Sequence, residues 1–92
     1  MDKAYRREWR RKLKPIVFER IRGIASDLFA IPAERITASS SPENIEKWDS
    51  TQHLNLVLEI EEKFNLQLSP EEIEQMKNIG QIAKIVEDKL AS

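Results

Sequence analysis

The sequence contains no cysteine, which excludes disulfide bonds, thiolate metal ligands and cysteine nucleophiles. Its single histidine is His53, so we expect no metal site. Only two glycines interrupt a sequence that is rich in helix formers. No apolar run approaches the roughly 18 residues of a membrane span, and the N-terminus lacks the apolar segment of a secretory signal. These absences favour a cytoplasmic chain.

Length and charge limit the possible functions. The 92 residues suffice for one compact domain and leave little room for a deep catalytic pocket. Residues 1–22 carry nine Lys and Arg against three acidic residues, a net charge of +6, whereas the remaining 70 residues carry a net charge of −7. The acidic part is expected to attract basic partners.

Apolar periodicity predicts an all-α fold. Residues 15–30 are expected to form a first core helix, with one apolar face made of Val17, Ile21, Ile24 and Leu28. Residues 50–64 predict a second helix with a broad apolar side of Leu54, Leu56, Val57, Leu58, Ile60 and Phe64. A capping box at residues 69–72 predicts a short third helix, and Asn78 is expected to cap a last helix with the stripe Ile79, Ile82, Ile85, Val86 and Leu90. Residues 31–49 form a long connection, which Trp48 is expected to anchor on the bundle.

Ser50 lies where the long connection meets the second helix, so its hydroxyl is expected at a helix N-terminus. Unpaired backbone N–H groups and the helix dipole stabilise anions there, so a phosphodiester on Ser50 would be tolerated. A simple helix cap made by Ser50 or Asp49 explains the same residues. Position alone leaves both interpretations open.

The segment WDSTQHLNLVLEIEEKF, residues 48–64, resembles the attachment motif of acyl carrier proteins, in which Asp-Ser-Leu precedes an amphipathic helix ending in Glu-Glu-x-Phe. The matching residues are Asp49, Ser50, Leu56, Val57, Glu61, Glu62 and Phe64. The resemblance extends over about residues 18–90. It implies an acyl-carrier-like four-helix bundle of three longer helices and one short helix, with a long loop between helices 1 and 2.

The resemblance also implies a function. A phosphopantetheinyl transferase would attach 4′-phosphopantetheine from coenzyme A covalently to Ser50, with Asp49 assisting transferase recognition. The arm would hold an acyl chain as a thioester and present it to the acyl-loading and acyl-using enzymes of lipid, polyketide or related specialised biosynthesis. The chain itself is expected not to be an enzyme, because its sequence assembles no nucleophile and base. His53, on the apolar side of the second helix, is expected to be packed or edge-solvated rather than catalytic.

The polar side of the second helix is the expected docking surface. By the helical period, Gln52, Asn55, Glu59 and Glu62 lie opposite the apolar side, and Thr51 lies near its edge. Carboxylates there would steer partner enzymes with basic docking surfaces. Thr51 replaces the leucine usual in the family, and Gln52 and Asn55 replace acidic residues of typical fatty-acid carriers, so specialised partners are expected. In this family an acyl chain can also enter between the helices, where Leu54, Val57 and Ile73 are candidate lining residues.

Two other functions remain open. The chain could be an unmodified helical interaction module in which Thr51 marks the loss of attachment. It could also be a peptidyl or aminoacyl carrier, although the residues before Ser50 lack the Gly-Gly usual in that class. In each case we expect a monomer.

Residues 1–14 form a basic N-terminal extension, separate from the helical domain of residues 15–92. Tyr5, Trp9 and Leu13 recur at four-residue spacing on its basic sequence. Three interpretations compete: a solvated extension of the first helix, an arm for an acidic partner or membrane surface, and a nucleic-acid contact. Because Asp2 and Glu8 dilute the charge and the rest of the domain is acidic, no nucleic-acid partner is expected.

Overall fold

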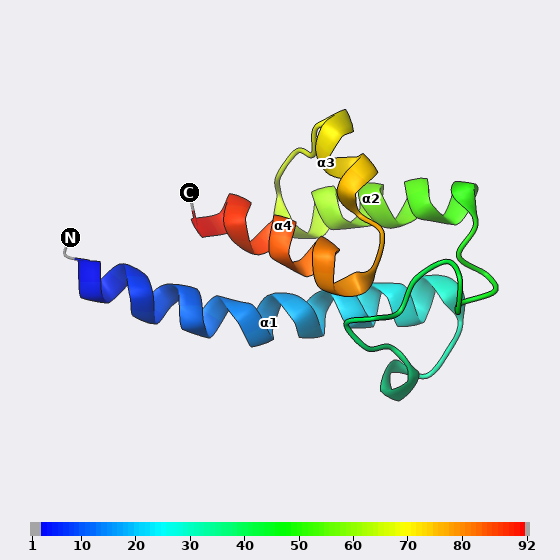
Figure 1. Cartoon of the computed structure of the whole chain (residues 1–92), viewed down its shortest axis with the longest axis horizontal. Coiled ribbons are helices and arrows are strands. Elements are labelled where there is room, and N and C mark those ends of the chain that lie inside the picture. Colours follow the sequence, from blue (N-terminus) through cyan, green and yellow to red (C-terminus); the bar gives the residue numbers. More distant parts are fainter. Residues whose placement is uncertain (1–2, 92) are drawn as a thin grey trace.

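The computed structural model describes the backbone of residues 3–91 and the side chains of residues 13–91. Four α-helices occur in this range: α1 (Lys3–Phe29), α2 (Ser50–Phe64), α3 (Pro70–Gln75) and α4 (Ile79–Ala91), with a 3₁₀ turn, η1 (Ala33–Arg35), between α1 and α2. Figure 1 shows α2 and α4 running along one side of α1, with the short α3 at the outer edge of the bundle. The described residues include no strand, so the predicted bundle of three longer helices and one short helix is confirmed.

Helix α1 begins before the core helix predicted for residues 15–30, in agreement with the interpretation of the basic N-terminal residues as an extension of the first helix. It continues through Pro15, the first residue of the predicted core helix. The residue 14 boundary therefore falls within one helix, and the first turns of α1 extend past the end of α4 (Figure 1). The side chains of Tyr5 and Trp9 lie outside the described residues, but Leu13 is buried in the core.

The buried face of α1 also differs in register from the prediction. Among the α1 side chains that the structure describes, five are buried, at strict steps of four: Leu13, Val17, Ile21, Ala25 and Phe29. Ile24 and Leu28, predicted for the core face, pack beside this stripe and are only partly buried. Rows of residues four apart form the ridges by which helices pack, so this stripe serves the contact of α1 with α2 and α4.

The two short connections near the C-terminus carry the predicted caps. Ser69 Oγ accepts a hydrogen bond from the Glu72 backbone N–H, and Glu72 Oε1 accepts one from the Ser69 backbone N–H at 2.8 Å. The Ser69 N–H is the main reason that the pKa of Glu72 lies below its ordinary value, and Lys89, 3.1 Å from its carboxylate, acts in the same direction. Asn78 Oδ1 accepts from the Gln81 backbone N–H at 2.8 Å, which caps α4 as predicted.

The long connection between α1 and α2 packs tightly on the bundle. Its apolar residues Ile36, Ile45 and Trp48 are buried. The backbone N–H of Gly80 donates to the Ala38 carbonyl at 2.8 Å, and a Cβ at Gly80 would come within 3.0 Å of that oxygen. The connection is therefore fastened to the start of α4. Across the described range, no helix combines the length and apolar character needed to cross a membrane.

Candidate functional site

Ser50 is the first residue of α2 and is exposed. The helix is capped by its neighbour, because Asp49 Oδ1 accepts a hydrogen bond from the Gln52 backbone N–H at 2.8 Å. Asp49 has the extended backbone typical of an N-cap, with φ −98° and ψ −174°. Of the two capping candidates, Asp49 therefore caps α2, and within the described part of the chain Ser50 Oγ takes part in no hydrogen bond.

Aromatic contacts fix the backbone that leads to Ser50. The Trp48 side chain is 2% exposed and stacks on Phe29, with ring centroids 5.2 Å apart. Its indole Nε1–H donates to His53 Nδ1 at 3.0 Å. The segment before Ser50 is thus held to α1 on one side and to the first turn of α2 on the other, which confirms Trp48 as an anchor of the connection.

A cavity of about 650 Å³ opens beside Ser50. Its apolar lining comes from α2, α3 and the residue that follows α3: Leu54, Ile73 and Met76. Two of the three predicted cleft residues, Leu54 and Ile73, therefore line it. Val57 does not line this cavity, because it is buried in the core one turn further along α2.

The polar residues predicted for docking divide into two groups. Thr51, Asn55 and Glu62 are exposed, whereas Gln52 and Glu59 are half-buried. Gln52 was expected opposite the apolar side, but its Nε2 donates to the Leu28 carbonyl at 3.2 Å and its Oε1 accepts from Asn55 at 2.8 Å. Gln52 therefore links α2 to the end of α1.

Two leucines on α2 correct the predicted apolar side. Leu54 and Leu58 were expected to be buried but are 58% and 61% exposed. Residues 54 and 58 are one turn apart, on the exposed side of α2 with Thr51 and Glu62, because the core takes only the sector of Leu56, Val57, Ile60 and Phe64. Sequence reasoning missed these exposed docking candidates, although six apolar residues in a 15-residue helix form an arc wider than one buried stripe.

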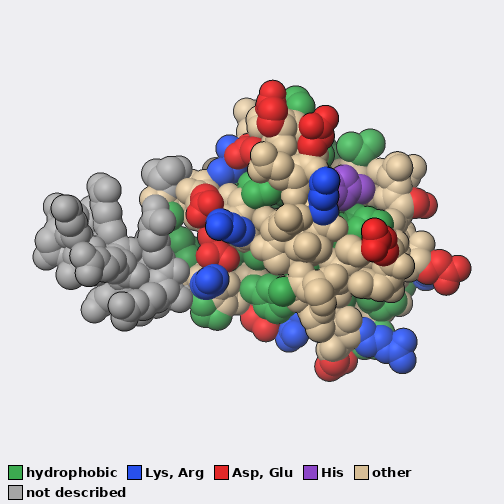
Figure 2. Space-filling model, in the orientation of Figure 1, with side chains coloured by type: hydrophobic (Ala, Val, Ile, Leu, Met, Phe, Trp, Pro, Cys, Tyr) green, Lys and Arg blue, Asp and Glu red, His purple; other side chains and the backbone are tan. Residues whose placement is uncertain are grey.

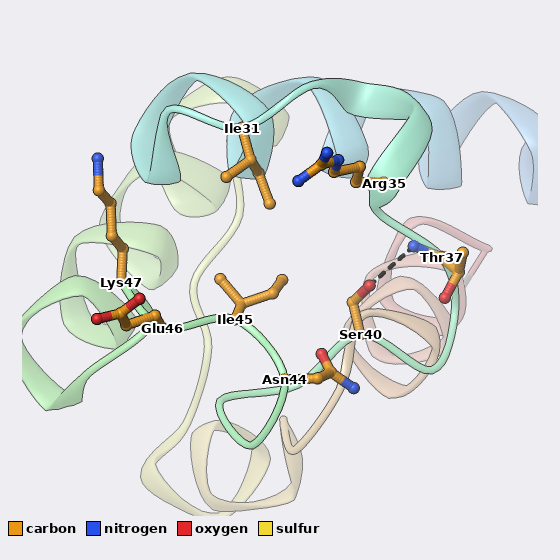
Figure 3. Close-up of a pocket in the computed structure, with 8 residues that line it drawn as sticks. All are labelled: Ile31, Arg35, Thr37, Ser40, Asn44, Ile45, Glu46 and Lys47. Carbon is orange, nitrogen blue, oxygen red and sulfur yellow. Dashed lines mark hydrogen bonds between the residues drawn. The ribbon is translucent and has the colours of Figure 1, made fainter.

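A second cavity, of about 510 Å³, lies within the connection between α1 and α2. Figure 3 shows Ile31 and Ile45 pointing toward each other across it, with Arg35 at its edge. The backbone N–H of Thr37 donates to Ser40 Oγ at 2.8 Å and closes one side. Ser50 is not among its lining residues, so this cavity is separate from the candidate site.

The fold and site define a small helical domain that presents one exposed serine beside a partly apolar cavity. A family model described as "Phosphopantetheine attachment site" matches residues 19–86. An acyl carrier protein of Helicobacter pylori is 30% identical over 76 residues, covering 82% of this chain and 97% of the relative. Acyl carrier proteins of Coprothermobacter proteolyticus and Guillardia theta are each 28% identical, over 80% and 83% of this chain and 90% and 94% of the relatives. The chain belongs to the acyl carrier protein family.

Family membership gives the chain a general role. Acyl carrier proteins hold acyl groups and are not catalysts, and their cofactor is phosphopantetheine. The residues present suit that group, because the Ser50 hydroxyl is exposed, unbonded within the described part and beside a cavity. The role implies interaction with a phosphopantetheinyl transferase and with acyl-handling enzymes.

Proposed function

We propose that Ser50 carries 4′-phosphopantetheine and that the chain presents acyl intermediates to enzymes of lipid, polyketide or related specialised biosynthesis. The observation that carries the proposal is that Asp49, and not Ser50, caps α2. Asp49 makes the helix cap, so the exposed hydroxyl of Ser50 needs no partner within the fold. A serine that capped its own helix would have its oxygen committed to a backbone N–H.

The start of α2 also suits a negatively charged linkage. The backbone N–H groups of a first helical turn and the positive end of the helix dipole stabilise a phosphodiester there. When bound, the arm supplies the thiol that holds an acyl chain as a thioester. The Asp49 carboxylate, exposed next to the serine, is placed to assist recognition by the transferase.

The exposed side of α2 is the proposed docking surface for partner enzymes. Leu54 and Leu58 offer apolar contact and Glu62 offers a carboxylate for basic partners, with the half-buried Glu59 at the edge of this surface toward α1. Thr51, next to Ser50, lies on the same exposed side of α2. Glu61 contributes less, because its Oε2 accepts from the Leu68 backbone N–H at 2.9 Å and holds the connection after α2.

The cavity beside Ser50 is the proposed entrance for an acyl chain, with Leu54, Ile73 and Met76 as its apolar lining. Transfer of an aliphatic chain out of water is favourable by roughly 0.8 kcal/mol for each buried CH₂ group.

The protein is proposed to act as a cytoplasmic monomer. The basic residues at the start of α1 extend this helix beyond the helical bundle, and they lie away from the proposed attachment point at Ser50 (Figure 1).

Intact-protein mass spectrometry tests this proposal. Incubation with coenzyme A, a divalent ion and a broad-specificity phosphopantetheinyl transferase should add one phosphopantetheine to the wild type and none to Ser50→Ala. Ser41→Ala is the matched control, since Ser41 lines the same cavity from the connection before α2 and should leave the modification unchanged. An unchanged wild-type mass with several transferases would favour the unmodified interaction module.

A further inference from the structure

The hydrogen bond between Trp48 and His53 determines where the imidazole carries its proton. An indole Nε1–H can only donate, so His53 Nδ1, 3.0 Å away, must be the acceptor. The two ring planes are inclined by only 19° to each other, with centroids 6.0 Å apart. Neutral His53 therefore carries its proton on Nε2, and the buried, stacked indole of Trp48 fixes this tautomer.

Because Trp48 occupies Nδ1, Nε2 is the ring nitrogen of His53 left to bind a ligand in the cavity. His53 lines the cavity beside Ser50, whereas Trp48 is not among the lining residues. Among the side chains and backbone that the structure describes, no atom accepts a hydrogen bond from His53 Nε2. Figure 2 shows the histidine (purple) at the surface of the described part, where a ligand can reach it.

Ser50 and His53 are spaced to act on one group. They lie three residues apart on α2, a spacing that puts their Cβ atoms about 5–6 Å apart, and both line the cavity. The first acceptor oxygens beyond Ser50 Oγ in a phosphopantetheine arm are those of the phosphodiester. Hydrogen bonds to such charged oxygens are roughly twice as strong as neutral ones.

The charged side chains that line the cavity are mostly acidic, so a neutral hydrogen-bond donor such as His53 would help to hold a phosphodiester there. Three carboxylates line it, from the connection before α2, the α2 cap and α3: Glu43, Asp49 and Glu74. Lys77, after α3, is the one basic residue among the described lining residues. These side chains thus oppose the anion that the start of α2 stabilises, and a donor close to the serine offsets their repulsion.

We propose that His53, held by Trp48 as the Nε2–H tautomer, donates a hydrogen bond to the phosphodiester of the arm on Ser50. The inference rests on the proposed attachment to Ser50. It assigns His53 a binding role toward the cofactor linkage and no part in bond chemistry. Trp48 acts indirectly, as the residue that sets the tautomer.

Nuclear magnetic resonance tests the proposal in two steps. In the unmodified wild type, ¹⁵N shifts of His53 at a pH where the ring is neutral should identify Nε2 as the protonated nitrogen. In the modified protein, the ³¹P shift of the phosphodiester should follow the His53 ¹⁵N shifts when the pH is varied. A phosphodiester has no second proton to lose, so this change must come from a neighbouring group.

Three variants separate the sources of that signal. His53→Gln keeps one amide donor and one acceptor but does not titrate, so the ³¹P shift should become independent of pH. Lys77→Gln removes the nearby cation, and the ³¹P titration should persist. Trp48→Phe keeps a ring on Phe29 but lacks the N–H, so the neutral imidazole proton should redistribute between both nitrogens, with circular dichroism as the folding control.

The outcomes distinguish this inference from the function on which it rests. A wild type that gains no mass and has no phosphodiester signal would remove the attachment itself. A ³¹P shift that stays constant while the His53 ¹⁵N shifts change with pH, or that has the same pH dependence in His53→Gln, would overturn the role of His53. A proton on Nδ1 in the unmodified wild type would overturn it without any variant.

Discussion

Asp49 combines a structural role with the proposed recognition role, and two substitutions separate them. Asp49→Ala removes the oxygen that accepts the Gln52 N–H at 2.8 Å. Loss of such a cap costs about 1 kcal/mol, and in a domain of this size that free energy lowers the melting temperature by roughly 4–8 °C. Asp49→Asn keeps a capping oxygen, and since Asn and Asp cap about equally well, its melting temperature should stay within about 2 °C of the wild type.

The assay is the initial rate of modification by one transferase, measured at a temperature well below both melting temperatures. If the transferase recognises the carboxylate, both variants should be modified more slowly than the wild type by a similar factor, although only Asp49→Ala is less stable. An Asp49→Asn variant modified at the wild-type rate would refute the recognition role and leave Asp49 as a cap alone.

Four further variants test residues of α2 and α3. Thr51→Leu should be modified at least as fast as the wild type, because it restores the apolar residue usual in the family, and slower initial rates would contradict this. Leu58→Ser should leave the fold intact and weaken binding to a partner enzyme by roughly 5–30-fold, the equivalent of about 1–2 kcal/mol of apolar burial. Glu62→Lys should mainly slow association at low salt. Stopped-flow kinetics would detect both effects, and wild-type kinetics in both variants would exclude this side of α2 as the docking surface. Because the Ser69 N–H lowers the pKa of Glu72, folding stability should fall as the pH drops below the ordinary value of 4.5. Glu72→Gln should therefore lose less melting temperature than the wild type between pH 7 and pH 3, and an equal loss in both proteins would contradict this.

Local chemistry made much of the fold predictable. The bounds of α2 follow from Asp49 as a cap and Phe64 as the last apolar residue of the pattern, and they agree with the structure. The capping box at residues 69–72 and the cap at Asn78 could also be predicted from the sequence, because each depends on groups within four residues of one another. Trp48 could be expected to anchor the connection, since an isolated large apolar residue in a long loop gains most by packing.

Other features depend on contacts between distant segments. Periodicity gives the angle of a side chain around a helix but not the width of the sector that neighbours cover, so the exposure of Leu54 and Leu58 was missed. The bond from Gln52 to the Leu28 carbonyl joins residues 24 apart in sequence, and no local pattern encodes it. The Trp48–His53 bond depends on how the connection turns into α2, so the orientation of His53 became known only from the structure.

Acyl loading tests the central claim most directly, because a carrier must hold an acyl group through its cofactor. The modified protein would be loaded with a fatty acyl group by an acyl-transferring enzyme, and its intact mass would be measured before and after neutral hydroxylamine, which cleaves thioesters. We predict one acyl group on the modified wild type, its complete removal by hydroxylamine, and no acylation of Ser50→Ala. Acylation that resists hydroxylamine, or that persists in Ser50→Ala, would contradict carriage on an arm at Ser50.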